Sequence, residues 1–574
     1  MEKQTFILWV MISVFLPACT FSPMIGVEGD FQLTVAHMND THSFIEPALL
    51  KVTPMGEDAF TVETSDIART VTKVAQLRSE HPNLLFLHAG DMTQGSFYSM
   101  RYHGDSDLFF FNLMELDGMV TGNHEFDHGP EKLSEFISKA QFPFLVANIE
   151  SQEDAYLQNS FFPYKIKYLN NEPVGIIGLV TKEVAEISSP GKDLKFSEVK
   201  LTAQNTIDEL ESKGVDKIII LSHIYYENDK KLAGQLHGVD IIVGGHSHSL
   251  LGNFHPLGLE AEGEYPTVMK DSDGHPVLVV QAWEYGKALG VLNVDFDSRG
   301  YISSYNGQPI IVISDTLRNG KGELLTGNAL VEARKIVDQQ PGLEVVDRNI
   351  EAAAQAAIYK KGIEQFETKV VGRADTDLPH VRQPTDALPG GSMIAPAVCD
   401  AFLWKARVLG TKADLVIQNS GGVRIDIKQG SITVADVYTL LPFKNTMAVI
   451  SLTGGEIKQL FESVLSNIYD MEQGDGAFPY VAGMRYQIKK NGLPGERVRF
   501  MELQLASDKW EPMKNDKTYR VVFNSYLASG KSGYDLLATK KVDNELSFID
   551  SDIFMEYLQK KGHIGFLEPR ISVE

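Results

Sequence analysis

The feature that most constrains the fold of this chain is a series of short apolar runs that each end in polar side chains. Runs of this length and composition are typical of β-strands. Four of them lie at residues 31–36, 84–87, 217–221 and 239–243. Between them lie segments with helical periodicity, among them residues 67–79 and 201–213. This alternation predicts an α/β domain, in which ligands gather at the carboxyl ends of the strands.

The chain has 574 residues, which is too long for a single hydrophobic core. Further expected strands at 174–180, 277–282 and 289–296 predict that the first sheet is doubled into a sandwich. An alanine-rich segment from Leu343 to Lys361 predicts a partly exposed connecting helix. We therefore expect a first domain at 30–340, a connecting helix at 341–367 and a second domain at 368–574.

The charge balance limits the partners of the chain. Its formal net charge is −23 and its pI is about 5.1. Binding to nucleic acid, or to anionic lipid through protein charge, needs a basic field that this composition does not supply. An anionic substrate must therefore be captured locally, by metal ions or by a few placed arginines.

The first 19 residues predict an export signal. An apolar run at 6–16 is too short to span a bilayer and leads to Leu16-Pro17-Ala18-Cys19, which resembles a bacterial lipobox. On this interpretation Cys19 carries a lipid, and the protein lies in the periplasm or on the outer membrane. A plainly cleaved signal and an uncleaved anchor are the alternatives. Cys399 is the only other cysteine, so a lipidated Cys19 leaves no intramolecular disulfide.

Potential metal ligands follow the expected strands. A lone histidine at a strand end is usually a hydrogen-bonding residue, but the order Asp-x-His, Gly-Asp, Gly-Asn-His, His and Gly-His-x-His is hard to explain that way. This mixture of carboxylate, amide and imidazole suits Zn, Mn or Co better than Ca. The number of candidates predicts two metal ions bridged by Asp91. The candidates are Asp40, His42, Asp91, Asn123, His223, His246 and His248.

One further histidine lies in the segment 121–127, between a candidate ligand and an aspartate. His124 follows Asn123, and Asp127 stands three positions further on, where it can hold the second ring nitrogen. Such a pairing orients an imidazole for proton donation or for stabilising negative charge.

These motifs resemble the calcineurin-like metallophosphoesterases, and residues from about 31 onward resemble the bacterial secreted 5'-nucleotidase and UDP-sugar hydrolase family. The resemblance implies a four-layer α/β-β/α sandwich followed by an α+β substrate-binding domain. It implies two divalent ions (Zn, Mn, Co or Mg) and makes His124 with Asp127 a transition-state-stabilising dyad. One ion would be held by Asp40, His42, Asp91 and His248, and the other by Asp91, Asn123, His223 and His246.

For the second domain, the resemblance implies a nucleotide site. Arg382 and Arg424 correspond to phosphate-binding arginines, whereas Phe443 and Tyr526 correspond to the two aromatics that sandwich the base. Asn445 corresponds to the residue that hydrogen-bonds the base. Without this context, an isolated Phe or Arg is more often a core or surface residue.

Two positions depart from the family pattern. Leu378 stands where many relatives carry a further arginine, and Ser532 stands where they carry a ribose-binding aspartate. Ser532 can still hydrogen-bond a sugar hydroxyl as a neutral partner, and Lys531 beside it adds positive charge. These departures leave the substrate range open.

The predicted function is an extracytoplasmic 5'-nucleotidase that releases phosphate from nucleoside 5'-phosphates, with UDP-sugars as a further substrate class. The alternatives are a 2',3'-cyclic-nucleotide phosphodiesterase or 3'-nucleotidase, a relative that acts on sulfur-containing groups, and an exported lipoprotein that binds nucleotide without cleaving it. The expected partners are a nucleotide and, through the N-terminal lipid alone, a membrane. The sequence does not predict an oligomeric state.

A lipid on Cys19 as the only anchor has a direct consequence. Cys19→Ser removes the acylated thiol, so the protein should move from the membrane fraction of its host into the soluble fraction. Cell fractionation and immunoblotting measure this shift. Wild-type protein found free in the periplasm would contradict the lipobox interpretation.

Overall fold

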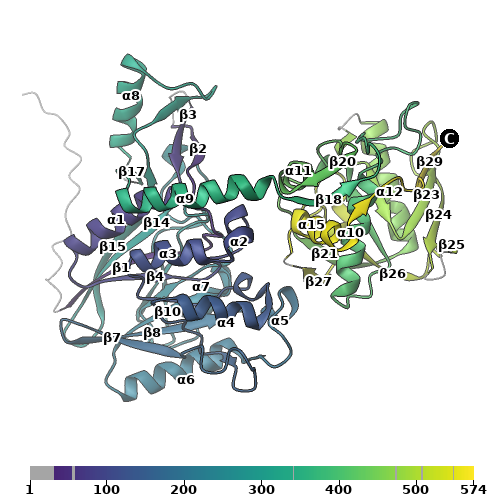
Figure 1. The fold of residues 1–574 in the computed structure, drawn as a ribbon. Coiled ribbons are helices and arrows are strands. Elements are labelled where there is room, and N and C mark those ends of the chain that lie inside the picture. Colours follow the sequence, from purple (N-terminus) through teal and green to yellow (C-terminus); the bar gives the residue numbers. More distant parts are fainter. Residues whose placement is uncertain (1–30, 55–58, 341, 472–474, 506–508, 547) are drawn as a thin grey trace, which may run out of the picture.

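The structure is a computed structural model that describes residues 31–54, 59–340, 342–471, 475–505, 509–546 and 548–574. The expected signal segment and Cys19 lie outside these residues. Two lobes are joined by one long helix, α9 (Ile350–Glu367) (Figure 1). Among the described helices, none is long and apolar enough to cross a membrane.

The first lobe contains two six-stranded sheets. One has the order β17 (Leu343–Val345), β15 (Ile302–Ile313), β14 (Leu289–Phe296), β1 (Phe31–Met38), β4 (Leu84–His88) and β5 (Gly118–Met119). The other has the order β12 (Thr267–Lys270), β13 (Pro276–Val280), β11 (Ile241–Val243), β10 (Lys217–His223), β8 (Glu172–Val180) and β7 (Tyr164–Leu169). The main helices of this lobe are α1 (Ile67–Glu80), α2 (Phe97–Tyr102), α3 (Asp105–Leu113), α4 (Gly129–Lys139), α6 (Val199–Ser212) and α7 (Tyr226–Ala233).

The two sheets pack face to face because side chains alternate along each strand. On β10, Ile219 and Leu221 join the core shared with β1 and β4, whereas Ile218 and Ile220 join the core beneath α6. A strand that is buried on both faces is expected to be a continuous apolar run, and residues 218–221 are such a run. With α1 on the outer face of the first sheet, the order is helix, sheet, sheet, helix, and the predicted α/β sandwich is confirmed.

The connecting helix begins later than predicted. Leu343–Val345 is not helical but forms β17, which pairs in parallel with Ile311 to Ile313 of β15. Leu343 is buried in this position, so tertiary packing overrides the helix propensity of the segment. The helix starts at Ile350, where the side chain of Asn349 accepts a hydrogen bond from the backbone N–H of Ala352.

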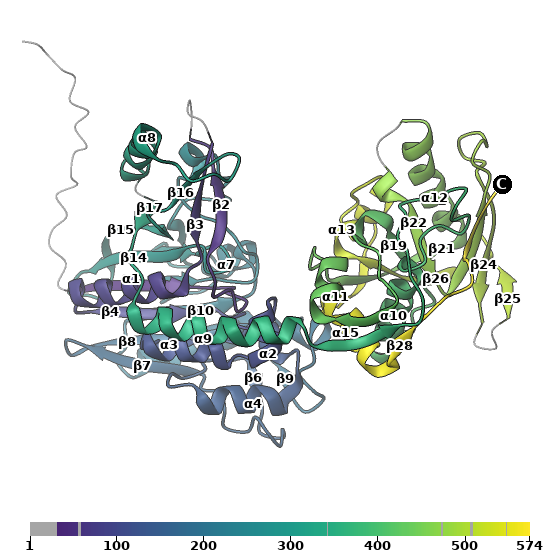
Figure 2. The ribbon, with the colours of Figure 1, turned by 45° about the horizontal axis from the view of Figure 1, so that its top comes forward.

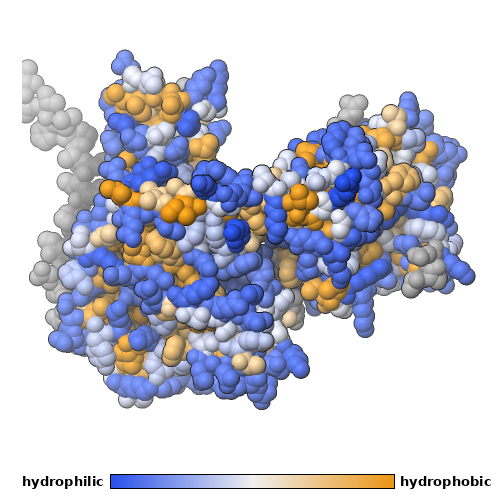
Figure 3. Space-filling model, in the orientation of Figure 1, coloured by the Kyte–Doolittle hydropathy of each residue, from blue (hydrophilic) through white to orange (hydrophobic). Residues whose placement is uncertain are grey.

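A projection on the first lobe was not predicted from the sequence. It consists of a three-stranded sheet of β16 (Leu317–Asn319), β3 (Phe60–Thr64) and β2 (Ala48–Val52), together with α8 (Gly327–Asp338). It has its own small core and stands above the sandwich (Figure 2). Apolar side chains are visible over α8 on its surface (Figure 3).

The second lobe is built on a five-stranded sheet with the order β22 (Pro479–Ala482), β19 (Leu415–Asn419), β26 (Thr518–Asn524), β21 (Met447–Thr453) and β27 (Val542–Leu546). A three-stranded sheet has the order β20 (Gly430–Thr433), β18 (Val370–Ala374) and β28 (His563–Ile564). A four-stranded sheet has the order β25 (Trp510–Pro512), β24 (Val498–Gln504), β23 (Met484–Ile488) and β29 (Ile571–Val573). Its longer helices are α10 (Ala395–Val408), α11 (Val434–Leu440), α12 (Gly454–Tyr469) and α15 (Asp550–Lys561). The buried residues of this lobe form a core of their own.

Most of α9 belongs to the first lobe. Ala352 and Ile363 are buried in the core of that lobe, and the Tyr102 hydroxyl donates to the backbone carbonyl of Tyr359 at 2.8 Å. Phe366, near the end of the helix, packs against the core of the second lobe. The chain therefore passes from one lobe to the other at the carboxyl end of α9.

Candidate functional site

The seven predicted metal ligands come together at the carboxyl ends of the strands. Parallel pairing of β1 with β4, and of β10 with both β8 and β11, brings these ends to neighbouring places in the two sheets. Asp40 and His42 follow β1, Asp91 follows β4, and Asn123 follows β5. His223 is the last residue of β10, and His246 and His248 follow β11. All seven side chains are buried or half-buried.

The potential ligand atoms lie close together. They form three groups, and within each group the potential ligand atoms lie within 4.8 Å of one another. The first group is Asp40, His42 and His248; the second is Asp91, His223 and His246; the third is His42, Asp91 and His124. Nε2 of His223 lies 3.1 Å from Oδ2 of Asp91, and Nε2 of His248 lies 3.4 Å from Oδ1 of Asp40. Because the groups share members, they form one continuous cluster.

Hydrogen bonds at Nδ1 fix which nitrogen of three imidazoles faces the cluster. Each of these nitrogens meets an oxygen acceptor, so it must donate, and a neutral ring then has its lone pair on Nε2. Nε2 of His42 and Nε2 of His248 lie 3.1 Å apart, a contact that forms a hydrogen bond when one ring carries the proton and that two neutral rings make only with a cation between them. The acceptors are Gln94 O for His42 (3.1 Å), Ala89 O for His223 (2.7 Å) and a Glu284 carboxylate oxygen for His248 (2.8 Å).

Three buried ligand atoms form no well-aligned hydrogen bond within the described residues: Oδ1 of Asn123, Nε2 of His246, and Nε2 of His223, which faces the Asp91 carboxylate at 3.1 Å. A buried polar atom without a hydrogen bond costs about 1–3 kcal/mol, so three at one place require an explanation. All three are atoms that divalent cations such as Zn²⁺ or Mn²⁺ accept as ligands. The donor set therefore fits divalent cations.

The electrostatics of the cluster favour the same ligands. Burial lowers the pKa of His42 and of His246 to about 3, so both rings are neutral and can coordinate. Burial also lowers the pKa of His223, but the carboxylate of Asp91 outweighs it and raises that pKa to about 9. Positive charge is thus stabilised beside Asp91.

The backbone around the cluster is held in an unusual conformation. Asp40, His42, Asp91, His246 and His248 all have positive φ, between 49° and 76°. Each such residue costs on the order of 1–3 kcal/mol and persists only where the surrounding structure enforces it. Gly122 is required by space, because a Cβ there would lie 2.0 Å from Oδ1 of Asp91.

His124 and Asp127 form the predicted pair. Nδ1 of His124 donates to Oδ2 of Asp127 at 2.6 Å, and Ser188 Oγ donates to the other carboxylate oxygen at 2.7 Å. Burial lowers the pKa of His124, but the charges of Asp127 and Asp91 together raise it to about 10. A protonated ring fixed in this way presents Nε2–H as a donor near the cluster.

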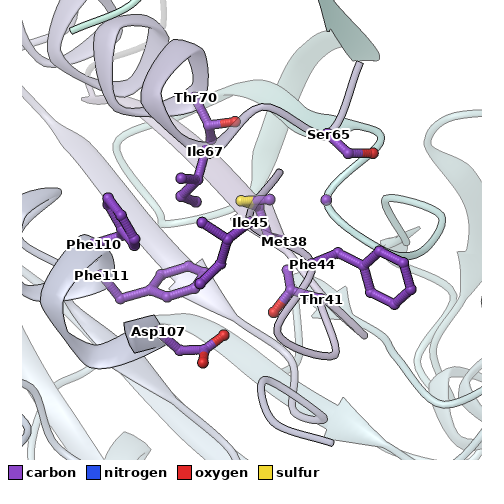
Figure 4. A pocket seen from close by; sticks show the side chains of 11 residues that line it. Met38, Thr41, Phe44, Ile45, Ser65, Ile67, Thr70, Asp107, Phe110 and Phe111 are labelled. Carbon is purple, nitrogen blue, oxygen red and sulfur yellow. The ribbon is translucent and has the colours of Figure 1, made fainter. Parts of the chain in front are cut away.

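A small cavity lies behind the loop that carries Asp40 and His42. Its volume is about 10 Å³, and Thr41, Ile45, Asp107 and Phe111 are among its lining residues (Figure 4). Such a space is at the lower limit for a single water molecule. It is therefore not a substrate site.

A second site lies in the second lobe. The six predicted substrate residues line one pocket of about 460 Å³, together with Asn419, Gly421, Gly422 and Gly476. Phe443 is 54% exposed and Tyr526 39% exposed, which leaves their rings available for a flat ligand. The six are Arg382, Arg424, Phe443, Asn445, Tyr526 and Ser532.

The structure shows which groups contact the two arginines of the pocket and the two residues that depart from the family pattern, Leu378 and Ser532. Nη1 of Arg382 lies 2.9 Å from Asp475, and the Arg424 guanidinium lies 5.5 Å from the centre of the Phe443 ring. Ser532 Oγ lies 2.8 Å from the Tyr526 hydroxyl. Leu378 is fully buried in the core of the second lobe and does not line the pocket.

The lobes touch beside both sites. Lys444, between Phe443 and Asn445, donates to the backbone carbonyl of Gly95 in the first lobe. Gln94 Nε2 donates to Asp552 at 3.2 Å. Sequence reasoning missed Lys444, Gln94, Glu284 and Asp475, because no local pattern indicates which distant segment a polar side chain will meet.

Two known protein families match the two lobes. Residues 33–250 match the calcineurin-like phosphoesterase family, and residues 370–539 match the C-terminal domain of 5'-nucleotidase. A Treponema pallidum protein named "Probable 5'-nucleotidase" is 37% identical over 525 residues, which cover 89% of this chain and 88% of the relative. The chain belongs to the 5'-nucleotidase family. This confirms the predicted family, and the chain is a metal-dependent phosphoester hydrolase.

Other members of the 5'-nucleotidase family match nearly the whole chain. The NAD 5'-nucleotidase of Haemophilus influenzae is 31% identical and covers 93% of this chain and 91% of its own length. The solved structure of Haemophilus influenzae NAD nucleotidase has a TM-score of 0.85 at 30% identity, covering 95% of this chain and 99% of that one. A 5'-nucleotidase precursor from Thermus thermophilus has a TM-score of 0.57 at 35% identity, with the same coverage.

The His124–Asp127 pair generates a prediction about catalysis. If His124 has its predicted role, His124→Ala removes one donor to the charge that develops in the transition state, so kcat should fall roughly 10²- to 10³-fold while bound metal is retained. Steady-state kinetics and elemental analysis measure the two quantities. Loss of metal together with activity would instead make His124 a ligand or a structural residue.

A matched control for this substitution is His275→Ala. His275 is a surface histidine of the same lobe that stacks on Tyr301 at 4.4 Å between ring centres. Its removal should leave both kcat and metal content unchanged.

Proposed function

We propose that this member of the 5'-nucleotidase family hydrolyses nucleoside 5'-phosphates to nucleoside and phosphate. The observation that carries the proposal is the pairing of two sites, a cluster of cation ligands in the first lobe and a pocket of arginines and exposed aromatics in the second. The first suits a phosphate and the second suits a base. The names of the relatives support the same substrate class.

We assign two divalent cations to the first site. Asp40, His42, Asp91 and His248 would hold one, and Asp91, Asn123, His223 and His246 the other, with Asp91 shared. The atoms of Asn123, His223 and His246 that lack a well-aligned hydrogen bond and the facing Nε2 atoms of His42 and His248 support this assignment. Divalent cations at such a site polarise phosphoryl oxygens and make hydroxide available near neutral pH. Zn, Mn, Co and Mg are the candidates.

The side chains of the protein supply the remaining stabilisation. Asp127 holds Nδ1 of His124, so Nε2–H donates to the oxygen on which negative charge develops as the phosphoester bond breaks. Arg382 and Arg424 bind the phosphate through charge-assisted hydrogen bonds. Asp475, which now pairs with Arg382, is the group that the phosphate would replace.

Base recognition comes from Phe443, Tyr526 and Asn445. Stacking between two rings tolerates every base, since each base has a π-face, so we expect loose base specificity. Ser532 is bonded to the Tyr526 hydroxyl and offers a neutral partner to the sugar. UDP-sugars and dinucleotides also carry a base that can stack between the two rings, so we include them as further substrates.

Turnover then requires the lobes to move. The ten residues that line the nucleotide pocket all lie in the second lobe, whereas the cation ligands all lie in the first. A TM-score of 0.57 to a chain that is 35% identical over 95% of this sequence is expected when two similar lobes are placed differently. Because α9 packs on the first lobe, we place the hinge at its carboxyl end, after Glu367.

We further propose that the protein acts outside the cytoplasm, anchored by a lipid on Cys19. The apolar run at 6–16 and the lipobox-like ending support this location. The Thermus thermophilus relative is named as a precursor, which is in keeping with a removed leader in that protein.

A phosphate-release panel on the purified protein tests the function. AMP and UMP should be cleaved, and chelation should abolish the activity. UDP-glucose, NAD, 2',3'-cyclic AMP and a plain phosphomonoester distinguish the rival substrate classes. A protein that binds AMP but releases no phosphate with any added divalent cation would be a binding lipoprotein, and the proposal would be wrong.

The aromatic pair generates a sharper prediction. Phe443→Ala combined with Tyr526→Ala should raise the KM for AMP. The expected loss of binding free energy is roughly 1–3 kcal/mol for each stacking partner removed. Hydrolysis of a small phosphomonoester without a base should change little, because such a substrate reaches the cations without the pocket. Steady-state kinetics on both substrates measure this difference.

Phe500→Ala provides the control, since Phe500 is an exposed phenylalanine of β24 that does not line the pocket. It should leave both substrates unaffected. If the double variant has wild-type kinetics on AMP, the two aromatics have no part in binding the base.

A further inference from the structure

Glu125 is a buried carboxylate whose contacts link two of the loops that carry the cation ligands. It lies in the short 3-10 helix at His124–Phe126, and only 6% of the residue is exposed. One oxygen accepts from the backbone N–H groups of Met92 (2.8 Å) and Thr93 (3.1 Å), and from Thr93 Oγ1 (3.3 Å). The other accepts from the backbone N–H groups of Asp91 (3.0 Å) and Gly122 (2.7 Å).

These donors use the full acceptor capacity of a carboxylate. Two carboxylate oxygens offer about four lone-pair positions, and here four backbone N–H groups and one hydroxyl point at them. Successive N–H groups that converge on an anion form a concave nest, and hydrogen bonds to an ionised acceptor are stronger than neutral ones. The arrangement therefore suits a carboxylate and not a neutral amide.

The contacts join the ends of two loops whose parent strands, β4 and β5, are paired only at Leu87 with Gly118 and His88 with Met119. Residues 91–93 follow β4, and Gly122 precedes Asn123 after β5. The link is reciprocal, since Oδ1 of Asp91 accepts from the backbone N–H of His124 at 2.9 Å. Each loop thus holds the other through a carboxylate, and the strained φ of Asp91 (53°) is enforced from both sides.

We propose that Glu125 is a positioning residue that sets Asp91, Asn123 and His124 in place before any cation binds. The hydrogen bonds of Glu125 go to backbone N–H groups and to Thr93 Oγ1 and not to the proposed ligand atoms, so it acts through the backbone of the residues that carry them. The inference rests on the proposed function only in taking Asp91 and Asn123 as cation ligands. It makes the cluster a preformed site, so that binding does not have to order the two loops.

Hydrogen exchange on the metal-free wild type is the first test and needs no variant. The amides of Asp91, Met92, Thr93 and Gly122 should already be protected without cations, because Glu125 accepts from all four. If they exchange freely and become protected only when Mn²⁺ is added, the cations order the loops and the proposal is wrong.

Glu125→Gln is the second test. The shape is kept, but one terminal oxygen becomes an NH₂ group that faces N–H donors. In the metal-free variant, exchange at these four amides should rise by about tenfold or more, as local opening becomes easier. Mn²⁺ affinity, measured by calorimetry, should fall roughly 10- to 100-fold, the scale for losing a group that orients ligands.

Glu462→Gln is the matched control. Glu462 is also a buried carboxylate, 8% exposed, and it accepts from the backbone N–H groups of Arg497 and Val498 in the second lobe. This variant loses the same kind of contact but should keep wild-type Mn²⁺ affinity and wild-type exchange at 91–93 and 122. Equal effects of the two substitutions on Mn²⁺ affinity would mean a general loss of stability and would overturn the proposal.

Kinetics separate positioning from substrate binding. With Mn²⁺ at saturation, Glu125→Gln should lower kcat for AMP by about tenfold or more and leave KM within about twofold, because the base pocket lies in the other lobe. If the wild type proves inactive on AMP, the proposed function fails while exchange and Mn²⁺ affinity still test Glu125. Should Glu125→Gln not fold, the same measurements on Glu125→Asp, which keeps the charge but not the reach, decide the matter.

Discussion

The function of the first lobe depends on the convergence of buried carboxylates, an amide and imidazoles at its strand ends. Asp40 and Asp91 are buried there among imidazoles whose Nε2 atoms face one another or lack a well-aligned hydrogen bond. Burying such groups is unfavourable unless a positive charge compensates them. Packing of the two sheets supplies the stability that keeps this arrangement together. Bound cations would remove the unfavourable free energy of burying these groups, and this gain would contribute to cation affinity.

The sequence predicted this cluster well because strand periodicity and strand ends are local properties. Once β1, β4, β10 and β11 are recognised, parallel pairing alone brings the residues that follow them together. The same reasoning predicted His124 with Asp127, since three positions along one short helical turn place the two side chains side by side. The residues expected to bind substrate in the second lobe were different. Their segments carry no local signal strong enough to unite Arg382, Phe443 and Tyr526, and the family resemblance supplied that expectation.

What the sequence could not predict depends on contacts between distant segments. Leu343–Val345 became a strand because β15 offers it an edge, although its neighbours favour a helix. The positive φ of Asp40 and Asp91 is a property of the assembled loops, and although aspartate tolerates this conformation better than most residues, its presence in the sequence does not predict it. Glu125 stands within a recognised motif, but the residue types alone do not indicate that its side chain turns back to the loop after β4.

The contact between the lobes explains how two separate cores can serve one reaction. Lys444 reaches the first lobe from between Phe443 and Asn445, so the segment that lines the base pocket also meets the loop that follows Asp91. Burial lowers the pKa of Lys444 to about 8 even though Asp552 favours its charge, so desolvation offsets much of what this contact contributes.

Gln94 and Asp552 add a polar hydrogen bond, while Phe97 packs against both cores. An interface of this polar kind differs from the apolar interior of either lobe, and relative movement of the lobes is the ordinary behaviour of such an interface. On the proposed function, each site would be the rigid part, held within its own lobe, and the distance between the sites would be the part that changes.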